Sequence, residues 1–415
     1  MHLQSYQPTN TTESLQTIFE NKYELKDFEE QYFRYMDYEN IVEFNRTEYD
    51  DFMDILKRGN AIFVKAYEFY RKDLAKNLPD FAFMETLFAE KFPLSEYFLG
   101  RYDVIREAET GIYKFLETNA NTPGMITESC QVSRYLSPHP DPLLEGEGEK
   151  NTIKHPSPSR RRIEDEVQYH NSGADLRTYI QSIFARHPGK KIGILLPYSF
   201  EDEDFLTGLD YGDMIGEVAW MDTVIIADIF ESHIVEEKYF TMKGEKVDVV
   251  LDFFPFEFFL TDLDFCENFF QIAKSGNLTV YNPLESIVLQ DKLIFAVVYE
   301  NLDKYSQEER DFIQKHIPFT TREFQEDSSK YLAKWRFGRY GREIYQEQFY
   351  SSIPDSKDFI FQQKIVPEKC DDRENFLVFG AYTNFQDWLA LITRKQKKLT
   401  TADEDSRVTL VFVKE

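Results

Sequence analysis

Apolar and aromatic residues recur at helical spacing in the first part of the chain. The stretches YEFYRKDLAKNL (residues 67–78) and METLFAEKF (84–92) place such residues three and four positions apart, with charged residues between them. This spacing predicts amphipathic helices, so we expect a helical N-terminal segment over residues 1–92.

The middle of the chain alternates between helix-like and strand-like patterns. A helix is expected over residues 176–186, and three apolar stretches that follow it are typical of buried strands: KKIGILLPYS, TVIIADIF and VDVVLDFF. Strands that alternate with helices predict a three-layer α/β unit with a mostly parallel sheet. A second α/β region is expected from residue 281 to the C-terminus.

One segment breaks this pattern. Residues 133–166 are rich in Pro, Gly, Ser and charge and contain few residues that could form a core, so we predict a flexible insertion loop there. The histidines in and near it, His139, His155 and His170, do not follow the spacing of metal ligands. We assign them no function.

Composition limits the class of partner. The 415-residue chain has 42% hydrophobic residues, enough for a large core, and a formal net charge of -26. Surfaces that bind nucleic acid or anionic lipid carry excess Lys and Arg, so the charge argues against both. Such acidity suits a cationic substrate or serves solubility alone.

The sequence predicts a cytoplasmic protein that does not enter a membrane. Cys130, Cys266 and Cys370 have neither the CxxC spacing of a zinc site nor the pattern of a disulfide framework. The start of the chain lacks the charged and apolar parts of a secretory signal. The most apolar run, residues 252–270, contains Pro255 and several carboxylates and is predicted to be core.

A possible metal site follows a predicted strand at residues 112–116. Glu117 and Asn119 are two positions apart, so on an extended chain their side chains point the same way, and Asp103 could add a third oxygen ligand. Carboxylates and other hard oxygen ligands suit Mg²⁺. The alternative is that Glu117 and Asn119 cap a strand and form an Asx-turn.

Four separated stretches form a joint pattern. They are RYDVIREAETGIYKFLETNANTP (101–123), NPLESIVLQDKLIFAVVYE (282–300), KYLAKWRFGRYGREIY (330–345) and FIFQQKIVPE (359–368). Together they resemble the glutathionylspermidine synthase family, and the resemblance extends from about residue 93 onward except for the insertion loop.

The resemblance implies a nucleotide site. The residues expected to contact ATP are Lys292, Lys334, Arg339, Tyr340, Gly341, Gln362, Gln363, Lys364 and Ile365. Glycines, Gly338 among them, let backbone N–H groups approach phosphates, although the GxxxxGK[ST] spacing of a P-loop is absent. Taken alone, Lys292 could be a solvent-exposed helix lysine, and the glycine pair could be an ordinary turn.

The resemblance also implies residues for the chemistry and the substrates. Arg394 would steady the transferring phosphoryl group, because its guanidinium is always charged and can hold two oxygens. Arg101 would hold the substrate carboxylate. The remaining substrate contacts are expected at Thr122, Asp202, Glu203 and Asp204, the last three for the amine. An acidic helix start, favoured by the helix dipole, would look the same as this acidic cluster.

The chain departs from the family at two points. Where the family commonly has a glutamine after the adenine connection, the nearest residue here is Leu377, which puts one nucleotide or metal contact in doubt. The amidase domain of bifunctional members has no counterpart, so hydrolysis of the product is not expected.

The resemblance predicts an α/β, ATP-grasp-like ligase with a pre-ATP-grasp subdomain and a helical N-terminal segment. Residues 93–290 would hold metal and substrates, and residues 291–415 the nucleotide. The expected reaction uses ATP and Mg²⁺ to join glutathione or a similar peptide to spermidine or another amine through an acyl phosphate. The alternatives are a ligase with a different substrate pair and a catalytically impaired nucleotide-binding interaction protein.

Overall fold

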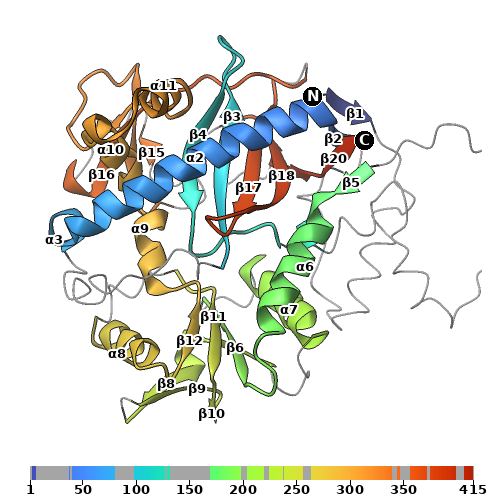
Figure 1. Ribbon diagram of the computed structural model, residues 1–415, viewed down its shortest axis with the longest axis vertical. Coiled ribbons are helices and arrows are strands. Elements are labelled where there is room, and N and C mark those ends of the chain that lie inside the picture. Colours follow the sequence, from blue (N-terminus) through green and yellow to red (C-terminus); the bar gives the residue numbers. More distant parts are fainter. Residues whose placement is uncertain are drawn as a thin grey trace, which may run out of the picture.

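The computed structural model describes residues 2–5, 37, 40–79, 98–126, 129–130, 169–197, 203–218, 224–236, 238–255, 263–338, 344–345, 356–371, 374–398 and 406–414. The predicted insertion loop and the stretch METLFAEKF lie outside these residues. The described elements confirm the mixed α/β fold and the long N-terminal helix (Figure 1). None of the described helices combines the length and apolar character needed to cross a bilayer.

A five-stranded antiparallel sheet lies at the centre, in the order β19-β18-β17-β3-β4. Its strands are β3 (Gly100–Arg106), β4 (Tyr113–Asn119), β17 (Phe376–Thr383), β18 (Trp388–Gln396) and β19 (Arg407–Thr409). Helix α2 (Arg46–Lys72) runs across one face (Figure 1). Phe52 and Phe63 of α2 pack against Phe379 and Tyr102 with ring centroids 5.3 and 5.2 Å apart. This face is therefore core, and the alternate residues of each strand occupy the other face.

Local sequence explains where α2 begins. The side chain of Asn45 accepts a hydrogen bond from the backbone N–H of Glu48, and the Glu48 carboxylate accepts one from the backbone N–H of Asn45. This capping box satisfies two N–H groups that the helix cannot pair internally. The short helix α3 (Leu74–Asn77) follows.

A parallel sheet in the order β12-β11-β6-β7 forms the lower part of the molecule in Figure 1. Its strands are β6 (Ile192–Leu196), β7 (Val224–Asp228), β11 (Val249–Asp252) and β12 (Thr279–Tyr281). The predicted parallel sheet is thus confirmed, with β6, β7 and β11 at the three apolar stretches.

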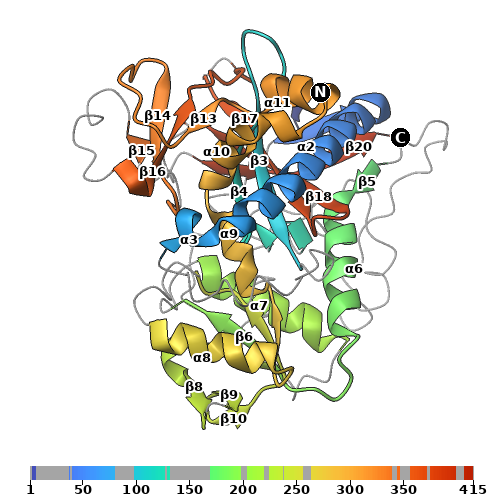
Figure 2. The same cartoon turned by 60° about the vertical axis from the view of Figure 1, so that its left-hand side comes forward.

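Helices and a small three-stranded sheet cover the two faces of the parallel sheet. One face packs against α6 (Ser172–Phe184) and α7 (Glu203–Gly216). The other packs against α8 (Leu263–Lys274) and the strands β8 (Ser232–Val235), β9 (Tyr239–Met242) and β10 (Glu245–Lys246), as Figure 2 also shows. Each face is therefore buried, which is why these strands are apolar throughout.

A smaller antiparallel sheet in the order β13-β16-β14-β15 lies beside α10 and α11 (Figure 2). The elements are α9 (Ile287–Gln290), α10 (Leu293–Glu300), α11 (Gln307–His316), β13 (Thr320–Thr321), β14 (Tyr331–Trp335), β15 (Ile344–Tyr345) and β16 (Phe359–Gln363). Short 3₁₀ turns are η7 (Ile229–Glu231), η9 (Leu284–Ser286), η10 (Leu302–Lys304) and η12 (Ser356–Asp358).

Another four-stranded sheet joins the two ends of the described chain. Its order is β1-β2-β20-β5, with β1 (His2–Ser5), β2 (Asn40–Asn45), β5 (Tyr169–Asn171) and β20 (Val411–Lys414). The helical pattern of the N-terminal segment did not predict β1 and β2. The central sheet likewise takes β3 and β4 from residues 93–290 and β17 to β19 from residues 291–415, so these two ranges share one sheet.

Candidate functional site

The face of the central sheet that lies opposite α2 carries the polar residues singled out in the sequence. In the pairing of β3 with β4, Arg101 lies opposite Asn119 and Asp103 lies opposite Glu117. Directly paired residues share a face, so the four side chains lie on one face, opposite α2. Asp103, Glu117 and Asn119 are thus brought together as predicted.

Arg101 and Asp103 form a buried, two-pronged ion pair. Arg101 Nε donates to Asp103 Oδ1 at 2.8 Å, and its Nη2 donates to Oδ2 at 3.2 Å. Gly380 on the neighbouring strand leaves room for this arrangement, because a Cβ there would lie 2.9 Å from Arg101 Cδ. Arg394 reaches the same carboxylate from β18, with its Nη2 3.6 Å from Asp103 Oδ2.

Glu117 lies in a field of four cations. Burial raises the pKa of its carboxyl, but Lys292, Lys334, Arg394 and Arg101 lower it, and the cations prevail, so the pKa lies below its usual value. Lys292 Nζ is 3.6 Å from Glu117 Oε2. Glu117 is therefore ionised at neutral pH.

Lys334 comes from the small sheet and points toward the central one. Its Nζ lies 3.4 Å from the carbonyl oxygen of Leu116, the residue before Glu117. The side chain is buried, and this desolvation lowers the pKa of the ammonium to about 8 although Glu117 raises it. The lysine therefore retains its charge at neutral pH, close to its titration point.

Lys292 is held by hydrogen bonds to residues 336–338, which follow β14. Its backbone N–H donates to the carbonyl of Arg336 at 3.0 Å, and its Nζ donates to the carbonyl of Gly338. The preceding residue, Asp291, is fully buried and pairs with the Arg336 guanidinium. The solvent-exposed alternative for Lys292 is therefore wrong.

Gln362 shares a face of the small sheet with Lys334. Leu332 pairs with Gln362, and Lys334 is two residues further along β14, so both side chains point the same way. Gln362 is buried and its Nε2 donates to Thr320 Oγ1 at 3.3 Å.

The connection after Gln362 leads back to the central sheet. Gln363 is exposed, its N–H donates to the Phe319 carbonyl at 2.8 Å, and that of Lys364 donates to the Lys330 carbonyl at 2.8 Å. Ile365 is buried in a cluster with Ile105, Phe376 and Val378. This segment therefore links the two sheets.

Several predicted residues lie apart from the cluster or outside the described chain. Asp202, Arg339, Tyr340 and Gly341 are among the residues not described, as are His139 and His155. Glu203 and Asp204 are the first residues of α7. Thr122 is half-buried just after β4. His170 lies in β5, paired with Val413.

Leu377 does not face this site. It is buried in the core beneath α2 with Phe379 and Ala381, whereas Val378 and Gly380 occupy the polar face. Its side chain is therefore a core contact in this structure, and a glutamine at this position would point away from Glu117.

Sequence reasoning missed residues that hold the site together. The Asn282 side chain accepts from the backbone N–H of Leu99 at 2.9 Å and donates to the carbonyls of Leu99 and Ala120 at 2.8 and 3.1 Å. Gln290 Oε1 accepts from the N–H of Ala120 at 2.8 Å. The Asn-Pro pair was visible in the sequence, but its partners, 160 residues away and more, were not.

The donor set fits a hard cation together with an anion. Asp103, Glu117 and Asn119 supply oxygens on one face, as Mg²⁺ prefers. Among the residues that the structure describes, Asn119 Nδ2 and Arg394 Nε are buried without a hydrogen-bond partner. The amide of Asn119 can be turned to present its oxygen instead. No group of three or more His, Cys, Asp or Glu gathers anywhere in the described chain, so a metal ion here would depend on Asn119 in addition to the two carboxylates.

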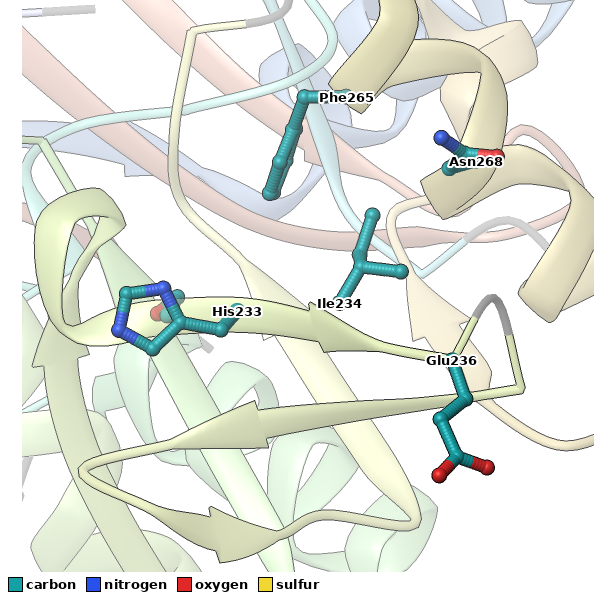
Figure 3. Close-up of a pocket in the computed structure, with 6 residues that line it drawn as sticks. His233, Ile234, Glu236, Phe265 and Asn268 are labelled. Atoms are coloured by element: carbon teal, nitrogen blue, oxygen red, sulfur yellow. The ribbon is translucent and has the colours of Figure 1, made fainter.

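A separate surface pocket of about 620 Å³ lies between β8 and α8 (Figure 3). Ile234 points toward Phe265 and Asn268 of α8, while His233 and Glu236 point to other sides. The predicted site residues do not line it, so this pocket does not define the candidate site.

Among the solved structures that match, one supports the fold. A glutathione synthetase like-effector from Globodera pallida, in its apo form, matches with a TM-score of 0.53 and 11% identity over 96% of this chain and 97% of that chain. A candidate gamma-glutamylcysteine synthetase from Methylobacillus flagellatus matches with a TM-score of 0.43 and 9% identity over 84% and 85%. No curated protein sequence matches significantly.

The family comparison covers nearly the whole chain. The family described as "Glutathionylspermidine synthase preATP-grasp" matches residues 9–409, which include both sheets and every residue of the polar cluster. The chain belongs to the glutathionylspermidine synthase preATP-grasp family.

Proposed function

We propose that this protein is an ATP-dependent ligase that joins a carboxylate to an amine. The observation that carries the proposal is the meeting of two sheets at Glu117: the central sheet contributes Arg101 and Arg394, and the region of the small sheet contributes Lys292 and Lys334. An excess of fixed cations around two carboxylates suits a triphosphate and its metal ion.

The nucleotide would lie between the two sheets. Lys292 and Lys334 would contact its phosphates, and Gln362 with the backbone of residues 363–365 would line the adenine pocket. Arg339, Tyr340 and Gly341 would close over it, which excludes water from a reactive intermediate. Mg²⁺ held by Asp103, Glu117 and Asn119 would neutralise phosphate charge. We keep residues 291–415 as the proposed nucleotide-binding range.

The chain's own groups account for both chemical steps. A substrate carboxylate oxygen, oriented by Arg101, attacks the terminal phosphorus and ADP leaves, which gives an acyl phosphate. Arg394 would stabilise the transferring group, and this role is supported by its buried Nε, which has no hydrogen-bond partner among the described residues. The amine nitrogen then attacks the acyl carbon, phosphate leaves, and the nitrogen loses a proton, so an amide results.

The substrates we propose are glutathione or a similar peptide and spermidine or another amine. Family membership supports this pair, and the chain's net charge of -26 favours a cationic acceptor. Thr122 would contact the peptide, and Asp202, Glu203 and Asp204 the amine. The proposed location is the cytoplasm.

Measuring ADP release across a panel of peptides and amines tests the proposal. We expect release only when both a carboxylate and an amine are present. Lys334→Ala should weaken ATP binding, whereas Arg394→Ala should mainly reduce kcat. Lys330→Ala is the matched control, because the side chain of Lys330 is exposed and pairs with Asp327 at the surface. ATP binding without turnover for every pair would favour an impaired nucleotide-binding protein, and unchanged rates in both site variants would refute the assignment.

A further inference from the structure

Asp252 is a buried carboxyl group whose hydrogen bonding is incomplete. Its side chain is fully buried, and Oδ1 accepts a hydrogen bond from the backbone N–H of Phe254 at 2.9 Å. Within the described part of the chain, Oδ2 has no hydrogen-bond partner. Burial raises the pKa of this carboxyl well above its usual value, and the Phe254 N–H lowers it only in part, so burial favours the protonated form of the group.

Two other buried aspartates, Asp228 and Asp291, are more fully paired than Asp252. Asp228, at the same edge of the parallel sheet, accepts hydrogen bonds through Oδ1 from the N–H groups of Phe230 and Glu231 at 2.8 and 3.0 Å. Asp291 pairs with Arg336. A buried carboxyl oxygen without a hydrogen-bond partner costs stability, so a purely structural role does not account for Asp252.

The position of Asp252 connects it to the candidate site. It is the last residue of β11, at the carboxyl edge of a parallel sheet, where ligands of such sheets commonly bind. The adjacent strand β12 ends at Tyr281, and the next residue, Asn282, donates to the carbonyl of Ala120, which follows Asn119. The neighbour on the other side, β6, leads toward α7 and its acidic start.

We propose that Asp252 is a specificity-determining residue that binds an ammonium group of a substrate remote from the reacting atoms. This inference rests on the proposed ligase function. The ammonium is either the far end of a diamine or the α-amino group of the peptide. When the ammonium binds the protonated form, the O–H bond of Asp252 breaks, the proton leaves to solvent, and the carboxylate pairs with the cation.

Paired substrates distinguish the two sources of the ammonium group. Putrescine is compared with butylamine, and glutathione with N-acetylglutathione, each pair differing in one charged end. We expect Asp252→Asn to raise the KM of putrescine or of glutathione by at least about tenfold. The KM of the matching analogue that lacks the charged end, butylamine or N-acetylglutathione, should change by less than about twofold. Asp228→Asn is the control: asparagine also caps well, so both pairs should behave as in the wild type.

Calorimetry gives a readout that does not depend on turnover. Titrations of spermidine and glutathione in two buffers of different ionisation enthalpy should show proton release for the wild type that is lost in Asp252→Asn. Equal effects on both members of each substrate pair, no effect on either, or identical proton release in wild type and variant would each overturn the inference. If no pair yields ADP, the ligase proposal fails, and the calorimetric comparison alone decides the role of Asp252.

Discussion

Replacing Asp291 with Asn should destabilise the protein strongly, because it leaves a buried guanidinium without its counter-charge. Arg336 Nε lies 3.1 Å from both carboxylate oxygens of Asp291, and its Nη2 contacts Oδ2. The Tyr70 hydroxyl donates to the same carboxylate at 2.5 Å. The Asp291 side chain is 0% exposed and that of Arg336 is 11% exposed, so water cannot replace the lost partner.

The magnitude follows from this burial. Breaking a buried pair by removing one charge costs about 3–5 kcal/mol, and asparagine retains one acceptor, so we expect about 3 kcal/mol. Tyr70→Phe should cost about 1.5–3 kcal/mol, the value of one buried hydrogen bond to a charged group. Because Lys292 follows Asp291, the Asp291→Asn variant should also bind ATP more weakly.

Urea denaturation followed by fluorescence provides the measurement, with the midpoint compared at unchanged slope. The double variant Asp291→Asn/Arg336→Met should recover much of the loss, because it removes the uncompensated charge. Asp327→Asn is the control, since Asp327 pairs with Lys330 at the surface and its replacement should leave the denaturation midpoint nearly unchanged. If Asp291→Asn lies within about 1 kcal/mol of the wild type, the assignment of this pair as a buried support is wrong.

Three further predictions concern packing and pH. Gly380→Ala would place a Cβ 2.9 Å from Arg101 Cδ and 3.0 Å from Ile392 Cγ2, so we expect a loss of about 1–3 kcal/mol in thermal unfolding and a lower kcat. Since burial lowers the pKa of Lys334 to about 8, ATP affinity should fall as pH rises above 8, a dependence that Lys334→Arg should remove in binding titrations. Burial lowers the pKa of His316 to about 4 from 6.5, although its bond to the Tyr113 carbonyl raises it. Between these two pKa values the unfolded chain therefore binds more protons than the folded chain, so stability should fall by roughly 1–3 kcal/mol as the pH drops from 7 to 4. In melting curves, His316→Gln should reduce this loss. A stability that does not change with pH in the wild type would contradict the prediction.

Local patterns predicted much of the fold. The apolar runs in β6, β7 and β11 were sufficient, because strands buried on both faces must be apolar along their whole length. The two-residue spacing of Glu117 and Asn119 likewise placed them on one face. The strands β1 and β2 were missed, since short strands leave little periodicity to detect.

Contacts distant in sequence could not be predicted. No local signal pairs Asp291 with Arg336 or directs Asn282 to Ala120, because these contacts depend on how separate elements pack. Leu377 illustrates the same limit: a shift of one position along a strand changes the face that a side chain occupies. Its neighbours Val378 and Gly380 face the site, and only the strand register reveals this.

The order of strands in the sheet β1-β2-β20-β5 has a consequence for biosynthesis. Strand β20 lies between β2 and β5 and pairs with β2 in parallel, although almost the whole chain separates them. During translation β2 cannot form this pairing until residues 411–414 have left the ribosome, and closing so long a loop is slow. Deleting residues 411–414 should therefore trap the nascent protein with open strand edges that chaperones or proteases would meet first.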